Sequence, residues 1–267
     1  MTIPRVLSIA GSDSGGGAGI QADLKAFAAC GVHGMTALTA ITAQNTTGVS
    51  GIHHVPPEMI LEQVRAVSTD IGLDAVKIGM LGTVATIEAV ARALAELPAS
   101  LPVVLDPVMV AESGAELLES DARASLIELV LPRATVATPN LPEARTLVAA
   151  DRERPIEELA RAIKELGPDY VVITGGHRDQ AVDVFFDGRD LIEIPGDRYP
   201  DGASHGSGCT HSSVLAARLA WGDSPLDAAR LAKELAARAV ADGLEQVGAG
   251  AGPVDVLGLA ARREPAA

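Results

Sequence analysis

Short apolar, β-branched runs alternate along this chain with longer segments whose apolar residues recur at helical spacing. The runs predict buried strands at Arg5–Ala10, Ala75–Ile78, Val103–Asp106, Thr135–Ala137 and Tyr170–Thr174, with Gly34–Thr39 as a weaker candidate. Their near-continuous hydrophobicity is typical of a parallel sheet covered on both faces. The longer segments predict helices at Gly19–Ala29, Pro56–Thr69, Thr83–Glu96, Ala122–Leu131, Leu141–Ala149, Ile156–Leu166, Cys209–Trp221 and Pro225–Glu245. Such alternation indicates βαβ units with right-handed crossovers.

The pattern changes late in the chain. Val182–Phe186 and Asp190–Pro195 are separated by Asp187-Gly188-Arg189, which predicts a β-hairpin appended to the sheet. The length of 267 residues allows one large domain or two small ones. Because no Ser-, Gly- or Pro-rich linker and no internal repeat divides the chain, we expect a single domain over residues 1–267.

The amino-acid composition argues against several classes of binding partner. The chain is 48% hydrophobic and 21% charged, so it can bury a sizeable core. Its formal net charge of −14 repels nucleic acid and anionic membrane, and 2% aromatic residues are too few for a base-stacking platform. No apolar run reaches the roughly 18 residues that a membrane span needs. Without a recognisable secretory signal, Cys30 and Cys209 predict two free thiols in a cytoplasmic protein.

The segment His205-Gly206-Ser207-Gly208-Cys209-Thr210-His211 predicts a tight turn that feeds the N-terminus of a helix. Such a turn offers free N–H groups and the positive end of the helix dipole, which favour a phosphate. The same field favours a thiolate, so a depressed pKa is expected for Cys209. A zinc site with the two flanking histidines, a cysteine hydrolase and a merely structural small residue remain alternatives.

Other unusual residues follow the predicted strands, at the edge where an open parallel sheet binds its ligands. These loops are Gly11–Gly19, Gly79–Gly82, Asp106–Met109, Thr138–Glu143 and Thr174–His177. Together they predict a cleft. The first loop lacks the third glycine of a dinucleotide-binding fingerprint and the Gly-Lys-Ser/Thr of a phosphate-binding P-loop, so it is either a flexible turn or a close approach to a small substrate.

Several polar residues near this edge have two interpretations. Asp23 either reaches the cleft or complements a helix dipole. Asp106 and Glu143 either hold Mg²⁺ through water or serve as a turn former and a helix-start residue. Lys233 either is solvated or extends its charge toward the phosphate site.

The chain resembles the bacterial hydroxymethylpyrimidine/phosphomethylpyrimidine kinases of thiamine biosynthesis, which belong to the ribokinase-like superfamily. The resemblance runs in order through AGSDSGGGAGIQADLKAF, TAITAQNT, VKIGML, LDPVMV, TPNLPEA, ITGGH, HGSGCT and GAGAGPV, which together extend over nearly the whole chain. It implies a three-layer α/β/α sandwich around a mostly parallel sheet. It also implies ATP-dependent phosphorylation of 4-amino-5-hydroxymethyl-2-methylpyrimidine, then of its monophosphate, and a homodimer.

The resemblance also implies roles for individual residues. Gly206, Ser207 and Gly208 would form the anion hole, and Cys209 would be the catalytic base. The pyrimidine pocket would include Gly11, Asp23, Gln44, Met80 and Val108. Asp106 and Glu143 would organise Mg²⁺, while the ATP contacts would be Lys233, Asn140, Thr174 and Gly176.

Two positions depart from the family pattern. Position 207 is serine where threonine is more usual, and both offer a hydroxyl. His211 stands where we expect an apolar residue, and the sequence suggests no function for it. The alternative activities are a pyridoxal kinase and a ligand-binding protein without catalysis. Gln44 and Met80 favour the aminopyrimidine, because a carboxamide both donates to and accepts from its ring edge. Intact Cys209, Asp106 and Lys233 favour catalysis.

Overall fold

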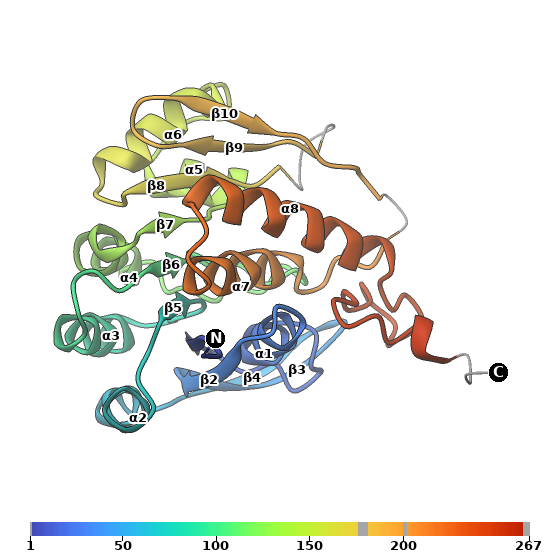
Figure 1. The fold of residues 1–267 in the computed structure, drawn as a ribbon, viewed down its shortest axis with the longest axis horizontal. Helices are drawn as coiled ribbons and strands as arrows, with labels where there is room; N and C mark the ends of the chain where they lie inside the picture. Colours follow the sequence, from blue (N-terminus) through green and yellow to red (C-terminus); the bar gives the residue numbers. More distant parts are fainter. Residues whose placement is uncertain (1, 176–180, 200–201, 264–267) are drawn as a thin grey trace.

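A large central sheet organises the protein. The structure, a computed structural model, describes residues 2–175, 181–199 and 202–263. Within them, one sheet has the strand order β10-β9-β8-β7-β6-β5-β1-β2 (Figure 1). Its strands are β1 (Arg5–Ala10), β2 (His33–Leu38), β5 (Ala75–Ile78), β6 (Val103–Leu105), β7 (Val136–Ala137), β8 (Tyr170–Ile173), β9 (Asp183–Phe186) and β10 (Leu191–Ile194). In this sheet β2, β1, β5, β6, β7 and β8 pair in parallel, whereas β9 pairs antiparallel with β8 and with β10, which confirms the mostly parallel sheet and the late hairpin.

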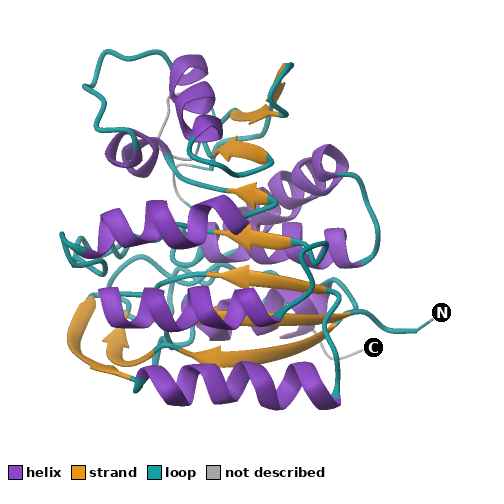
Figure 2. Cartoon of the chain, turned by 90° about the vertical axis from the view of Figure 1, so that its left-hand side faces the viewer, coloured by secondary structure: helices purple, strands orange, loops and turns teal. Residues whose placement is uncertain are grey.

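Helices cover both faces of this sheet, and each face has its own apolar core. The helices are α1 (Gly19–Ala29), α2 (Pro57–Asp70), α3 (Val84–Glu96), α4 (Ala122–Ser125), α5 (Leu141–Leu147), α6 (Ile156–Glu165), α7 (Ser207–Ala220) and α8 (Pro225–Ala241). In β8, Val172 packs with residues of α7 and α8, while Val171 and Ile173 pack with residues of α5 and α6. Neighbouring strand residues thus face opposite layers, and the turned view shows helices in front of the strands (Figure 2).

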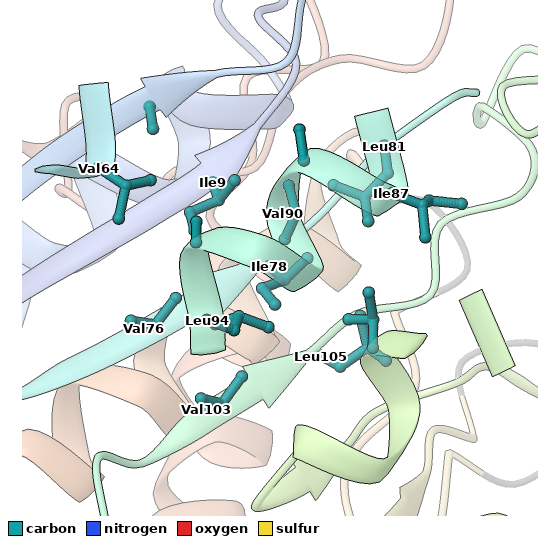
Figure 3. Close-up of a cluster of buried hydrophobic side chains, with 14 of the residues drawn as sticks. Ile9, Val64, Val76, Ile78, Leu81, Ile87, Val90, Leu94, Val103 and Leu105 are labelled. Atoms are coloured by element: carbon teal, nitrogen blue, oxygen red, sulfur yellow. The ribbon is translucent and has the colours of Figure 1, made fainter. Parts of the chain in front are cut away.

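The core beneath α2 and α3 illustrates this packing. Ile9, Val76 and Ile78 of the sheet meet Val64 of α2 and Val90 of α3, all essentially inaccessible to solvent (Figure 3). The three-layer arrangement predicted from continuous apolar strands is therefore confirmed. None of the described helices combines the length and apolar character needed to cross a membrane.

Two of the predicted helices differ most from the structure at their carboxyl ends. The segment expected as one helix over Ala122–Leu131 is α4 followed by a π-helical turn, Leu126–Val130, and a 3₁₀ turn, Leu131–Arg133. Pro132 has no N–H to donate, so a regular α-helix cannot continue through this point. The last helix ends at Ala241 rather than at Glu245.

The sequence pattern did not indicate a second, two-stranded sheet formed by β3 (Ala40–Asn45) and β4 (Gly48–His54). Its residues are polar or glycine in many places and mostly solvent-accessible, so they carry little hydrophobic pattern. The hairpin is joined to the glycine-rich loop after β1, because Ser12 N donates to Ala40 O at 2.9 Å. This small sheet therefore forms a flap beside the carboxyl end of β1.

Candidate active site

A cavity of about 450 Å³ opens at the carboxyl ends of the parallel strands. Most of the residues expected at the site line it: Gly11, Gln44, Met80, Asp106, Val108, Asn140, Glu143, Thr174, Gly206, Ser207, Gly208, Cys209 and Lys233. Gly176 lies outside the described residues. The predicted cleft is thus present, and loops far apart in sequence meet there because parallel strands end at a common edge.

One end of the cavity is the start of α7. Gly206 is the N-cap residue, with φ at 84°, and a Cβ at this position would overlap the carbonyl oxygen of Gly17. Only glycine fits this left-handed, closely packed conformation. The N–H groups of Gly208 and Cys209 fall in the first turn, where an α-helix provides no carbonyl partner. Because this turn borders the cavity, its geometry suits the anion site that the sequence predicts.

Cys209 is half-buried in this turn, and it lines the cavity together with Gly19 at the start of α1. Burial raises its pKa to about 12, Lys77 opposes the rise, and Asp23 and Asp106 add to it. The expectation of a depressed pKa is therefore wrong for the free protein. The helix field is outweighed by desolvation and two nearby carboxylates, so Cys209 is a thiol at neutral pH.

The glycine-rich loop after β1 is held together by Asp13, whose role the sequence reading missed. Its carboxylate accepts from the N–H groups of Gly15, Gly17 and Ala18 at 2.8–3.0 Å. The same carboxylate lies 2.8 Å from His205 Nε2. Asp13 therefore ties the first loop of the chain to the anion site. An aspartate within a run of small residues is a signal for such backbone bonding.

Replacing Asp13 with asparagine is expected to lower the free energy of unfolding by about 1–3 kcal/mol at pH 7, as hydrogen bonds to a buried charge are lost. Burial opposes ionisation, but His205 and the loop amides hold the pKa of Asp13 below its usual 3.8. A lowered pKa stabilises the fold above the usual value, and this contribution disappears as pH falls through the folded value. Urea denaturation of both proteins at several pH values measures the contribution of Asp13 to the free energy of unfolding.

The control for this prediction is Asp151→Asn, because Asp151 also accepts two backbone N–H groups, from Glu153 and Arg154, but in an exposed turn. Its stability is expected to change little. An Asp13→Asn protein as stable as the control at pH 7 would contradict the assignment of Asp13 as the anchor of the loop.

Gln44, Met80 and Val108 also line the cavity. Gln44 is positioned by Ser14, whose hydroxyl donates to the Gln44 carbonyl at 2.7 Å and accepts from its N–H at 2.8 Å. The Gln44 side-chain oxygen accepts from Thr42 Oγ1 at 3.1 Å. The flap thus contributes a carboxamide to a cavity that two apolar side chains also line, which suits a flat ring with polar edges.

Two buried carboxylates, Asp106 and Glu143, share the middle of the cavity. Glu143 forms a capping box with Asn140 at the start of α5, which confirms the interpretation of this glutamate as a helix-start residue. This role does not exclude binding of a cation. Burial raises the pKa of Asp106, against Lys77 and Ser212, while burial and the charge of Asp106 raise the pKa of Glu143 to about 8.

Two carboxylates that disfavour each other's charge suit a divalent cation, which would relieve the repulsion. The described part of the chain holds no cluster of three or more histidine, cysteine, aspartate or glutamate side chains able to bind a metal. A cation at Asp106 and Glu143 would therefore complete its shell with water or phosphate oxygens, as Mg²⁺ does. The zinc alternative is not supported, since His205 faces Asp13 and His211 faces Asp183.

The cavity is also lined by a charge cluster of Lys233, Asp183 and His211. Lys233 Nζ donates to Asp183 Oδ1 at 2.7 Å, and His211 Nε2 lies 3.3 Å from Asp183 Oδ2. Burial opposes ionisation, but His211 and Lys233 hold the pKa of Asp183 below its usual range. The Lys233 side chain is only 10% exposed, so it is not a solvated lysine. His211, an unexplained polar residue in the sequence, faces this carboxylate.

Asp23 does not take the place expected for it. Its side chain has no exposed surface and does not line the cavity. It instead accepts hydrogen bonds from Ser8, Lys77 and Ser213. The prediction of a pocket-closing aspartate is wrong, because α1 turns this residue toward α7 and the sheet. Its partner Lys77, a lysine within an otherwise apolar strand, was a signal of this pair.

The fold is similar to that of a solved pyridoxal kinase of Staphylococcus aureus in complex with AMP-PCP and pyridoxal. That structure aligns with a TM-score of 0.87 and 35% identity over 99% of this chain and 97% of its own. The fold and site thus define a ribokinase-like small-molecule kinase. Residues 13–255 match the family model of phosphomethylpyrimidine kinase, and the chain belongs to that family.

Curated relatives agree with this assignment. The chain is 46% identical to a hydroxymethylpyrimidine/phosphomethylpyrimidine kinase of Streptomyces coelicolor, over 96% of this chain and 95% of the relative. It is 45% identical to a thiamine biosynthesis bifunctional protein of Geobacter sulfurreducens, over 94% of this chain and 51% of that longer protein. The family inferred from the sequence motifs is therefore confirmed.

Proposed function

We propose that this protein transfers the γ-phosphoryl group of ATP to the hydroxymethyl group of 4-amino-5-hydroxymethyl-2-methylpyrimidine, and a second phosphoryl group to the resulting monophosphate, in thiamine biosynthesis. One observation carries the proposal: a single cavity is lined by Gln44, by the turn at the start of α7 with Cys209, and by the Asp106–Glu143 pair. Membership of the phosphomethylpyrimidine kinase family supports it, and an ATP-analogue complex of a structural neighbour supports the use of ATP.

In the proposed mechanism, Gln44 orients the aminopyrimidine while Gly11, Met80 and Val108 bound its pocket. The thiolate of Cys209 takes the proton of the alcohol as the alcohol oxygen bonds to the γ-phosphorus. The bond from that phosphorus to the bridging oxygen breaks, and its electron pair leaves with ADP. The N–H groups of Gly208 and Cys209 hold the phosphoryl oxygens, and the Ser207 hydroxyl lies at the same turn.

The remaining roles concern the nucleotide. Lys233 contacts its phosphates, and Asn140, Thr174 and Gly176 are proposed nucleotide contacts. Asp106 and Glu143 would hold Mg²⁺, which when bound supplies positive charge to the phosphate oxygens. The thiolate is a minor species in the free protein. Positive charge around the bound reactants raises the thiolate fraction, and this fraction sets how readily Cys209 takes the proton of the alcohol.

The test is a product assay with ATP, Mg²⁺ and the pyrimidine alcohol. Monophosphate and then diphosphate are expected. The second candidate activity is pyridoxal phosphorylation, which the likeness to the Staphylococcus aureus enzyme favours. A higher kcat/KM for pyridoxal would overturn the choice of substrate. Absence of turnover with both substrates would indicate a ligand-binding protein.

Replacing Gln44 with leucine is expected to lower kcat/KM for the pyrimidine about tenfold or more, because one or two hydrogen bonds to the ring edge are lost. Pyridoxal has no exocyclic amine at its ring edge, so its kcat/KM is expected to fall less. Steady-state kinetics with both substrates measure the ratio. An equal fall for both substrates would remove Gln44 from substrate discrimination.

Two further expectations come from the family resemblance. A homodimer is proposed, and a mass measurement in solution tests it. A cytoplasmic location stays a prediction. A single kinase domain over residues 1–267 likewise stays a prediction.

A further inference from the structure

A buried charge cluster, which the proposed mechanism does not use, lies beneath the catalytic thiol. Lys77 Nζ donates to both oxygens of Asp23, at 2.9 and 3.1 Å. Ser8 and Ser213 donate to the same carboxylate at 2.6 and 2.7 Å. All four residues have no accessible surface. An ion pair in such a place gives little net stability over an apolar pair, because both charges lose their hydration.

The register of two helices places this cluster next to Cys209. Gly19 at the start of α1 and Cys209 at the start of α7 both line the cavity. One turn further along both helices, Ser213 of α7 donates to Asp23 of α1. Residues one turn apart lie on the same helix face. The Asp23 carboxylate therefore lies about one turn along from the thiol, on the face that α1 and α7 share.

Lys77 comes from the sheet below these helices. It lies in β5, paired with Ser8 of β1 in the ladder, and it lines the cavity whereas Asp23 does not. Of the charged groups that act on the thiol, Lys77 is the cation, and Asp23 of α1 and Asp106 after β6 are the anions. The Lys77 ammonium group therefore adds its charge to the positive end of the α7 dipole and opposes the two carboxylates.

We propose that Lys77 is a positioning residue that stabilises the thiolate of Cys209, and that Asp23 limits how much of the lysine's charge reaches the sulfur. The inference rests on the proposed role of Cys209 as the base. Its physical basis is that two unit charges a few ångströms apart in a protein interior interact far more strongly than in water. Removing Lys77 and removing Asp23 therefore have opposite effects on the thiol.

The test measures the alkylation rate of Cys209 by iodoacetamide from pH 6 to pH 10, in the absence of nucleotide and substrate. All proteins carry Cys30→Ala, so that Cys209 is the one remaining cysteine. Lys77→Gln is expected to lower the rate at pH 8 about three- to tenfold, and Asp23→Asn to raise it by a similar factor. A tenfold change in thiolate fraction is partly offset by the change in nucleophilicity.

The matched control is Ser8→Ala, which removes a hydrogen bond to Asp23 but keeps both charges. Its alkylation rate is expected to stay within about twofold of the Cys30→Ala protein, a margin well below the shift expected for a lost charge. If Lys77→Gln does not fold, Asp23→Asn is compared with the neutral pair Asp23→Asn/Lys77→Gln. The proposal then requires a slower rate in the double variant.

Equal rates in the Lys77, Asp23 and Ser8 variants would overturn the proposal, and so would a faster rate in Lys77→Gln. The readout needs neither ATP nor the pyrimidine. A protein that forms no phosphorylated product but shows the expected order of alkylation rates would therefore contradict the proposed function alone.

Discussion

Cys209→Ala is expected to lower kcat for the pyrimidine alcohol by about 10²–10⁴, the range for the loss of a general base. The variant keeps the backbone N–H groups of the α7 turn, so binding of nucleotide and substrate is expected to persist and KM to change little. Steady-state product formation, with KM and kcat determined separately, measures the effect. This is one of the two largest effects that the site predicts.

The matched control is Cys30→Ala. Cys30 is the other half-buried thiol of the chain, at the end of α1, where its backbone carbonyl accepts from Trp221 Nε1 at 3.0 Å. That contact does not involve the sulfur, so the control is expected to keep the wild-type rate. A Cys209→Ala protein with a similar kcat would exclude the thiol as the base.

Gly206→Ala is expected to lower kcat by about 10²–10³, the effect of losing a donor aimed at developing negative charge. The added Cβ would overlap the Gly17 carbonyl oxygen, so the turn must move and carry the N–H groups of Gly208 and Cys209 with it. The positive φ of 84° adds further strain. Product formation at saturating substrate measures the loss.

Gly222→Ala is the control that separates backbone strain from displacement of the α7 turn. Gly222 follows the other end of α7 and has φ at 92°, but a Cβ there would meet nothing within 4 Å. Both variants carry the strain of a left-handed alanine, about 1–2 kcal/mol, while the displaced anion site belongs to Gly206→Ala alone. A kcat loss of the same size in Gly222→Ala would mean that global destabilisation, rather than the anion site, limits the rate.

The central sheet was predictable because its strands are apolar on both faces. Arg5–Ala10 and Ala75–Ile78 have the predicted bounds, and the other strands differ by a residue or so at their ends. The β3–β4 flap was not predictable by the same criterion, because the apolar Ile41 of β3 is 52% exposed between buried Ala40 and Thr42, and β4 has no buried residue. Hydrophobic periodicity reports burial, and this hairpin is little buried.

The residues of the site were predictable as a group, because they follow the strands, but not their pairings. Asp23 and Lys77 form a buried pair over a separation of 54 residues, which no local pattern reveals. The thiol of Cys209 illustrates the same limit. The helix terminus, which favours a thiolate, can be recognised from the sequence around Cys209. The desolvation and the carboxylates that raise the pKa of the thiol come from distant segments.

The contact of Asp13 with His205 joins segments 192 residues apart, and that of Ser213 with Asp23 spans 190. Closing such long loops is entropically costly and slows folding. The cavity walls come from both ends of the chain, so a partly folded or partly synthesised polypeptide has no assembled site. Recovery of catalysis during refolding would thus report completion of the whole topology, later than signals from the local helices.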